Sequence, residues 1–105
     1  MSREDATVRL AAYRRELDEL DAALVQILAR RFRVIARIGH LKARAGLPIR
    51  DPDREKEMLL SLARQGVEEG IAPALVRRVF TAILLHSRRR QRAIRRRHAR
   101  ALQRV

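Results

Sequence analysis

The chain has 105 residues and a mass of 12.2 kDa, so we expect a single domain spanning residues 1–105. The absence of cysteine excludes a disulfide scaffold, a thiolate zinc site and a cysteine nucleophile, and an aromatic content of 3% leaves few rings on which nucleic-acid bases could stack. The formal net charge of +13 points to an anionic partner, although its distribution weakens that inference.

The first predicted helix covers about residues 5–45, where apolar residues recur at intervals of three and four. Gly46 and Pro48 then end it, since glycine suits the position after a helix and proline cannot continue one. At ~1.5 Å per residue this helix is about 60 Å long, whereas a domain of about 100 residues has a radius of gyration of only ~13 Å. Two shorter helices of one chain cannot cover such a stripe, so we expect an obligate, intertwined homodimer.

Two more helices follow. Asp51 is a good N-cap and Pro52 suits a first helical turn, so the second helix begins there and ends near Gly66. Pro73 opens the third, whose apolar stripe extends to Ile94. No segment has the alternation and turn residues of a strand. The sequence therefore predicts an all-α fold of three helices with a very long first helix.

The C-terminal end is strongly basic. Nine arginines and no acidic residue lie in residues 88–105, which carry most of the excess charge. We expect a solvated, fraying helix end here rather than a nucleic-acid surface, because the stretch contains no groove-reading motif. No run of 18 apolar residues occurs and residues 1–10 contain no apolar signal segment, so we expect a cytoplasmic protein that does not enter a membrane.

Polar side chains interrupt the apolar faces of all three predicted helices. Arg31 lies three residues after Leu28, and Lys42 lies four after Ile38. The other residues on or beside these faces are Arg14, Asp51, Glu55, Ser87 and Gln91. An unpaired buried charge costs several kcal/mol, so these groups pair with one another or receive a charged ligand.

A small dicarboxylate fits this set, because the cations outnumber the acids and arginine binds a carboxylate through two hydrogen bonds. Two structural alternatives stay open: Arg31 can pair with Glu55 inside a dimer, and Asp51 can serve only as a helix cap. His40, His86 and His98 lack the spacing of a metal site or a catalytic triad, so we expect no metal.

The arrangement of these residues resembles the AroQ family of all-α chorismate mutases over about residues 8–92, with residues 93–105 left as a basic extension. Arg14 stands ahead of Leu20-Asp21, and Phe80 is followed by Ser87 and Gln91. The segments that carry the rest of the resemblance are Leu28-Ala29-Arg30-Arg31, Ile38-Gly39-His40-Leu41-Lys42 and Pro48-Ile49-Arg50-Asp51-Pro52-Asp53-Arg54-Glu55.

The resemblance implies an intertwined homodimer with two equivalent sites that isomerise chorismate to prephenate by a [3,3] rearrangement, without a cofactor or a metal, in aromatic amino acid or related secondary metabolism. By the family pattern, Arg14 of the partner chain and Arg31 hold the two carboxylates, and Lys42 and Gln91 hydrogen-bond the ether oxygen. The remaining substrate-binding residues are Ser87, which orients a carboxylate, Asp51 and Glu55, which address the ring hydroxyl, and Arg54, which lines the pocket.

Other functions stay open at this point. Relatives on this scaffold rearrange 4-amino-4-deoxychorismate or act as isochorismate pyruvate-lyases, and the sequence does not separate the first of these from the mutase. A non-catalytic basic dimer that binds nucleic acid or an acidic partner is a different class, although nucleic acid is not the expected partner. For the mutase, we expect truncation after Ala93 to leave activity largely intact.

Overall fold

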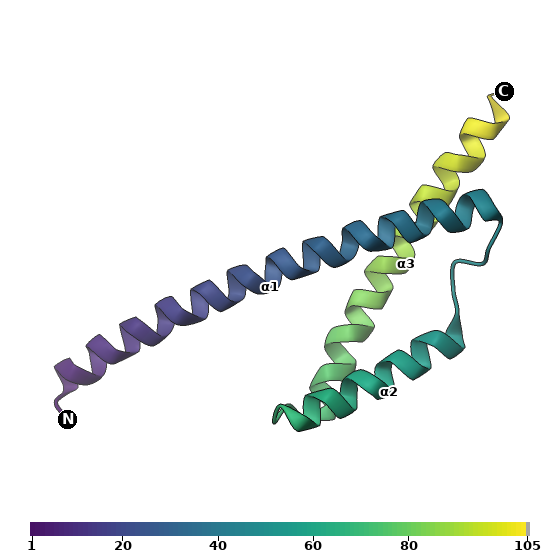
Figure 1. Cartoon of the computed structure of the whole chain (residues 1–105). Helices are drawn as coiled ribbons and strands as arrows, with labels where there is room; N and C mark the ends of the chain where they lie inside the picture. Colours follow the sequence, from purple (N-terminus) through teal and green to yellow (C-terminus); the bar gives the residue numbers. More distant parts are fainter. Residues whose placement is uncertain (105) are drawn as a thin grey trace. The chain divides into compact units, whose positions relative to one another are not determined.

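The computed structural model describes residues 1–104 (Figure 1). Over this range the chain forms three helices, α1 (Arg3–Ala45), α2 (Pro52–Glu68) and α3 (Pro73–Gln103), and no strand. The predicted all-α fold with a very long first helix is confirmed. The observed bounds differ by two residues at the start of α1 and at the end of α2, where helices commonly fray.

The chain divides into two compact units, Met1–Arg33 and a second that begins at Val34. The first unit is the N-terminal part of α1, which starts with a reciprocal cap. Ser2 Oγ accepts a hydrogen bond of 3.0 Å from the Asp5 amide, and the Ser2 amide donates one of 3.2 Å to Asp5 Oδ2. Hydrogen bonding to the Asp5 carboxyl by the Ser2 side chain and, second, by the Ser2 amide lowers the pKa of that carboxyl. The single-domain expectation stays a prediction.

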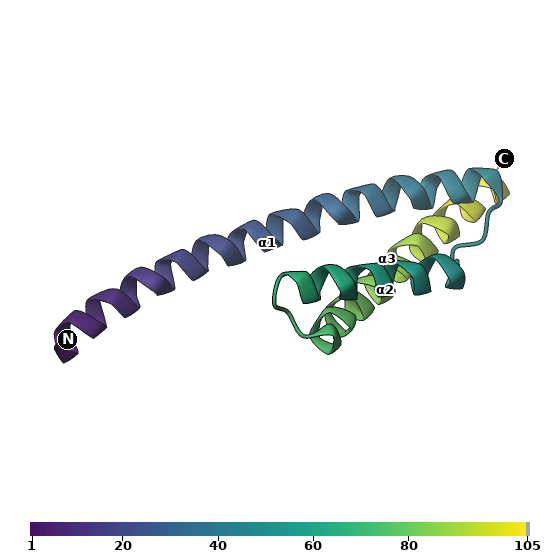
Figure 2. The ribbon, with the colours of Figure 1, turned by 60° about the horizontal axis from the view of Figure 1, so that its bottom comes forward.

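In the second unit, α2 and α3 follow each other in a helical hairpin (Figure 2) and contact each other. Ala63, Val76 and Ile94 are its buried apolar side chains, with Ile94 only 2% exposed. Gly66 permits the close approach of the two helices, because a Cβ atom there would lie 2.6 Å from Val76 Cγ2. The buried apolar side chains of the second unit thus come from α2 and α3.

The last turns of α1 belong to the second unit and pack on α3. Gly39 is buried, and a Cβ atom built on it would lie 3.1 Å from Ile94 Cδ1 and 3.2 Å from Gln91 Cγ. The predicted end of the helix is confirmed: Gly46 adopts a φ of +66°, and the amide of Leu47 donates to the carbonyl oxygen of Lys42 at 2.9 Å. Glycine thus serves close packing at position 39 and chain reversal at position 46.

The expected fraying of the C-terminal end is wrong over residues 88–103, whereas seven of the nine arginines there and at position 104 are exposed, as the sequence predicts. Helix α3 continues to Gln103, and Ile94 is the most deeply buried side chain among the described residues. Arg88 has only 20% of its side chain exposed, and Arg95 donates a hydrogen bond to the carbonyl oxygen of Leu47. The helix persists because its inner face is held by packing and hydrogen bonds while the remaining arginines face solvent.

None of the helices in residues 1–104 combines the length and apolar character that a membrane crossing requires.

Candidate active site

The second unit holds six of the eight side chains that the sequence singles out. Lys42 comes from α1, and Ser87 and Gln91 come from α3. The other three lie at the start of α2: Asp51, Arg54 and Glu55. Arg14 and Arg31 belong to the first unit. The fold therefore gathers residues from three separate segments of sequence into one unit.

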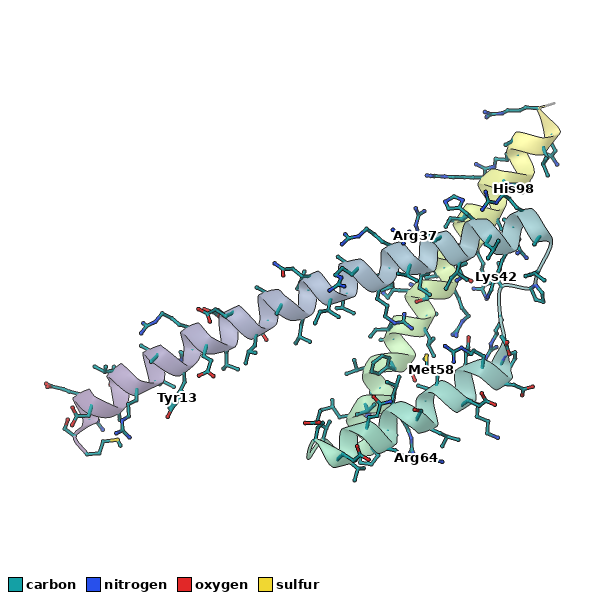
Figure 3. All side chains as sticks on the ribbon, viewed as in Figure 1. Tyr13, Arg37, Lys42, Met58, Arg64 and His98 are labelled. Atoms are coloured by element: carbon teal, nitrogen blue, oxygen red, sulfur yellow. The ribbon has the colours of Figure 1, made fainter. Side chains whose placement is uncertain are left out.

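Lys42 lies near the end of α1 and is partly buried (Figure 3). Its Nζ donates a hydrogen bond of 2.7 Å to the carbonyl oxygen of Ile49 in the loop before α2. Within residues 1–104 Lys42 forms no salt bridge with a carboxylate. An ammonium that donates to one carbonyl oxygen has two further N–H donors to offer an electron-rich atom.

Gln91 is 5% exposed and packs with its Cγ beside Gly39, which is three residues before Lys42 on α1. In the part of the chain that the structure describes, the Gln91 side-chain amide makes no hydrogen bond. Gln91 therefore packs on α1 about one helical turn before Lys42.

Ser87 lies one turn before Gln91 on α3 and is 4% exposed. Its hydroxyl donates to the carbonyl oxygen of Ile83 at 2.8 Å, a bond within the helix that fixes the side-chain rotamer.

Asp51 caps α2, as the sequence predicts. Its Oδ1 accepts a hydrogen bond of 3.1 Å from the amide of Arg54, and its carbonyl oxygen accepts one of 3.0 Å from the amide of Glu55. The side chains of Asp51 and Arg54 are exposed. Asp51 therefore has a structural role in the helix start, and its second carboxylate oxygen is left for other contacts.

Glu55 is the most shielded acid of this region, with 17% of its side chain exposed. Its Oε1 lies 3.0 Å from Nη1 of Arg88 on α3, and its Oε2 lies 3.6 Å from Nε of Arg50. The pair with Arg88 is a hydrogen-bonded salt bridge between α2 and α3, whereas Arg50 is 60% exposed and interacts more weakly. The Glu55 carboxylate is thus fixed in place, and the two guanidinium groups balance much of its charge.

Arg14 and Arg31 occupy α1 in the first unit. Arg14 is exposed, and Arg31 is partly buried. Burial lowers the pKa of the Arg31 guanidinium from its ordinary value, and the group stays charged at neutral pH because that ordinary value is so high. A partly desolvated guanidinium interacts strongly with a carboxylate ligand.

Two arginines of this region were not identified as site residues from sequence. Arg88 donates a hydrogen bond to Glu55. Arg95 on α3 donates to the Leu47 carbonyl oxygen and Lys42 on α1 donates to that of Ile49, so both residues bind the loop between α1 and α2. The helical spacing of α3 could have identified them, because Arg88 and Arg95 each lie four residues after Leu84 or Gln91 and so share one face of the helix with these two residues. They were not distinguished because arginines lie on all sides of this helix.

Residues 1–104 contain no group of three or more histidine, aspartate or glutamate side chains placed to hold a metal ion.

The model of the family chorismate mutase type II matches residues 13–92 of the chain. The chain belongs to this family. The matched range ends at the residue expected from the sequence and includes all eight site residues, from Arg14 to Gln91. The family match thus covers the described site and leaves the last part of α3 outside.

Similar proteins support the same assignment. The chain is 37% identical over 78 residues to the T-protein of Enterobacter agglomerans, covering 74% of this chain and 21% of that protein. It is 34% identical over 79 residues to the 4-amino-4-deoxychorismate mutase of Streptomyces pristinaespiralis, covering 75% and 61%. It is 25% identical over 80 residues to the chorismate mutase of Methanocaldococcus jannaschii, covering 76% and 81%. The chain spans about a fifth of the length of the T-proteins that it matches.

Proposed function

We propose that this chain is a chorismate mutase, an isomerase that converts chorismate to prephenate in aromatic amino acid or related secondary metabolism. One observation carries the proposal within the matched range: Lys42 and Gln91 are brought to the same end of α1 from segments far apart in sequence. A cation and an amide at one place suit an ether oxygen that gains negative charge as its bond to carbon breaks.

The reaction is unimolecular, so the protein needs to hold the substrate compact rather than attack it. Arg31 and Arg14 are the groups suited to the two carboxylates, because each guanidinium presents paired donors in a fixed geometry. Binding both carboxylates brings the reacting carbons together and removes conformational freedom before the barrier. Ser87, on α3, would orient one carboxylate.

Lys42 then acts in the transition state. Charge on the ether oxygen is greater there than in the bound substrate, so a preorganised ammonium stabilises the transition state more than the ground state. The bond to Ile49 holds the ammonium in place before the substrate arrives, and the Gln91 amide adds a second donor. No nucleophile, cofactor or metal enters this scheme.

The start of α2 is the region suited to the ring hydroxyl. Glu55 accepts a hydrogen bond through lone pairs not used by its arginine partners, and Asp51 offers its oxygen not used as a cap. Arg54, in the first turn of α2, lines the same region.

A homodimer forms part of the proposal. In the first unit, α1 leaves a row of apolar side chains 46–62% exposed: Leu10, Tyr13, Leu17, Leu20, Leu24 and Ile27. Tyr13, labelled in Figure 3, is one of them. Contiguous apolar surface of this kind is typical of an interface, and a second copy supplies a matching stripe under two-fold symmetry. Arg14 borders this row, so it is the residue that would complete the partner's site.

The 4-amino-4-deoxychorismate mutase among the relatives makes that compound the second candidate substrate, whereas the isochorismate pyruvate-lyase activity and the cytoplasmic location stay predictions. The test is a continuous assay of the purified protein with chorismate, in which chromatography identifies the product. We expect prephenate. A folded protein that leaves chorismate unchanged but rearranges the amino compound would assign the second substrate, and inactivity toward both would contradict the proposed function.

A further inference from the structure

Arg88 on α3 and Glu55 on α2 form a shielded salt bridge. Nη1 of Arg88 lies 3.0 Å from Oε1 of Glu55, and the two side chains are only 20% and 17% exposed. Arg50 approaches the other oxygen, Oε2, at 3.6 Å. Both oxygens of this carboxylate therefore already face a guanidinium.

This arrangement affects a neutral and a cationic ligand differently. A hydroxyl group carries no charge and donates to a lone pair that Arg88 does not use, so it needs no other change at Glu55. An aliphatic amine is protonated at neutral pH, and its ammonium must compete with Arg88 for one carboxylate while it is repelled by two guanidinium charges. Water screens the repulsion from the shielded Arg88 little, whereas Arg50, which is 60% exposed, contributes less to it.

We propose that Arg88 is a specificity-determining residue that adapts Glu55 to a neutral ring hydroxyl and disfavours a ring ammonium. The inference rests on the proposed function, in which Glu55 receives the substituent that distinguishes chorismate from 4-amino-4-deoxychorismate. It names the hydroxyl-bearing compound as the substrate class. Arg88 acts through its charge on Glu55, so its effect is on the choice of substrate and not on the rearrangement common to both compounds.

Three variants separate the charge of Arg88 from its hydrogen bond. Arg88→Met removes both, Arg88→Gln keeps a donor without the charge, and Arg88→Lys keeps the charge. Arg89→Met is the matched control, because Arg89 is the exposed neighbour on α3. For each folded protein, kcat and KM are measured with chorismate and with 4-amino-4-deoxychorismate.

We expect the parent to prefer chorismate, and both neutral variants to shift the ratio of the two kcat/KM values by about tenfold or more toward the amino compound. Arg88→Lys and Arg89→Met keep the parent's ratio. An equal loss on both substrates in the neutral variants, or a parent that prefers the amino compound, would overturn the role of Arg88 while leaving mutase activity established. A folded parent inactive on both compounds would overturn the proposed function and this inference together.

Discussion

Nζ of Lys42 donates a 2.7 Å hydrogen bond to the carbonyl oxygen of Ile49, seven residues further along the chain. This bond ties the end of α1 to the loop that leads into α2, and Arg95 of α3 donates to Leu47 in the same loop. The side chain proposed for catalysis is therefore held by the same loop that delivers Asp51 and Glu55 to the site. Positioning of this kind fixes a charge before the substrate binds.

Truncation of α3 tests whether its end supports the site. Removal of residues after Ala93 deletes Ile94, which is 2% exposed, and Arg95, which holds Leu47. We expect this protein to lose about 2–5 kcal/mol of stability, as for deletion of a large core side chain, and most of its activity. Truncation after Ala99 keeps both residues and is expected to keep both properties. Thermal unfolding and chorismate turnover of the two proteins check this.

The two outcomes separate the structural account from the sequence expectation. Full activity after truncation at Ala93 would restore the view that the whole extension is dispensable, whereas loss of activity on truncation after Ala99 would assign a role to the exposed arginines beyond it.

Gly39→Ala tests the placement of Gln91. The new Cβ atom would lie 3.2 Å from Gln91 Cγ and 3.1 Å from Ile94 Cδ1, so Gln91 must shift by a few tenths of an ångström. We expect kcat to fall several-fold. The free energy of unfolding should change little, because alanine's helix propensity, better than that of glycine by about 1 kcal/mol, offsets the cost of the close contact. Steady-state kinetics and denaturant unfolding measure the two effects.

Gly66→Ala is the matched substitution away from the site. Its Cβ atom would lie 2.6 Å from Val76 Cγ2, a side chain that is stiff at χ1, so we expect a loss of about 1–3 kcal/mol in stability with kcat retained in the folded protein. A Gly39→Ala protein with unchanged kcat would show that Gln91 is not placed by this packing.

Subunit complementation tests the sharing of Arg14. Arg14→Ala and Lys42→Ala chains, each nearly inactive alone, are unfolded together and refolded as a mixture. If Arg14 completes the partner's site, each mixed dimer contains one site with both residues intact, so we expect about a quarter of the parent's activity. If Arg14 serves its own chain's site, every site in the mixture lacks one residue and activity does not return.

Leu24→Glu tests whether a second copy of the chain covers the apolar row on α1. Leu24 is 59% exposed in the single chain, and a charge there opposes burial against a second copy. We expect sedimentation to show monomers and the activity to be lost. Gln26→Glu adds the same charge on the other side of the helix and should leave a dimer. Dimers of equal stability in the Leu24→Glu and Gln26→Glu proteins would contradict the proposed interface.

The sequence predicted the elements well because local rules decide them. Gly46 with Pro48 ends α1, Asp51 caps α2 and Pro73 opens α3 in the structure as expected. Polar positions on apolar faces also indicated Lys42, Glu55 and Gln91, which the fold brings into one unit.

Sequence reasoning did not assign Arg88 and Arg95, because a pattern of arginines on all sides of a helix does not show which of them another segment covers. The covering depends on where the loop after α1 and the start of α2 lie against α3, which is a tertiary property. The tight packing at Gly39 was missed for the same reason, since a lone glycine in a helix looks only like a tolerated residue.

The most direct test of the proposed mechanism compares the two lysines of the chain, Lys42 and Lys56, for turnover of chorismate. Lys56 is exposed on α2, so Lys56→Ala removes the same charge away from the site. With matched helical content in both proteins, we predict that Lys42→Ala lowers kcat by roughly 10²–10³, about 3–4 kcal/mol of transition-state stabilisation, while Lys56→Ala retains the parent's rate. Equal turnover by the two variants would contradict the account.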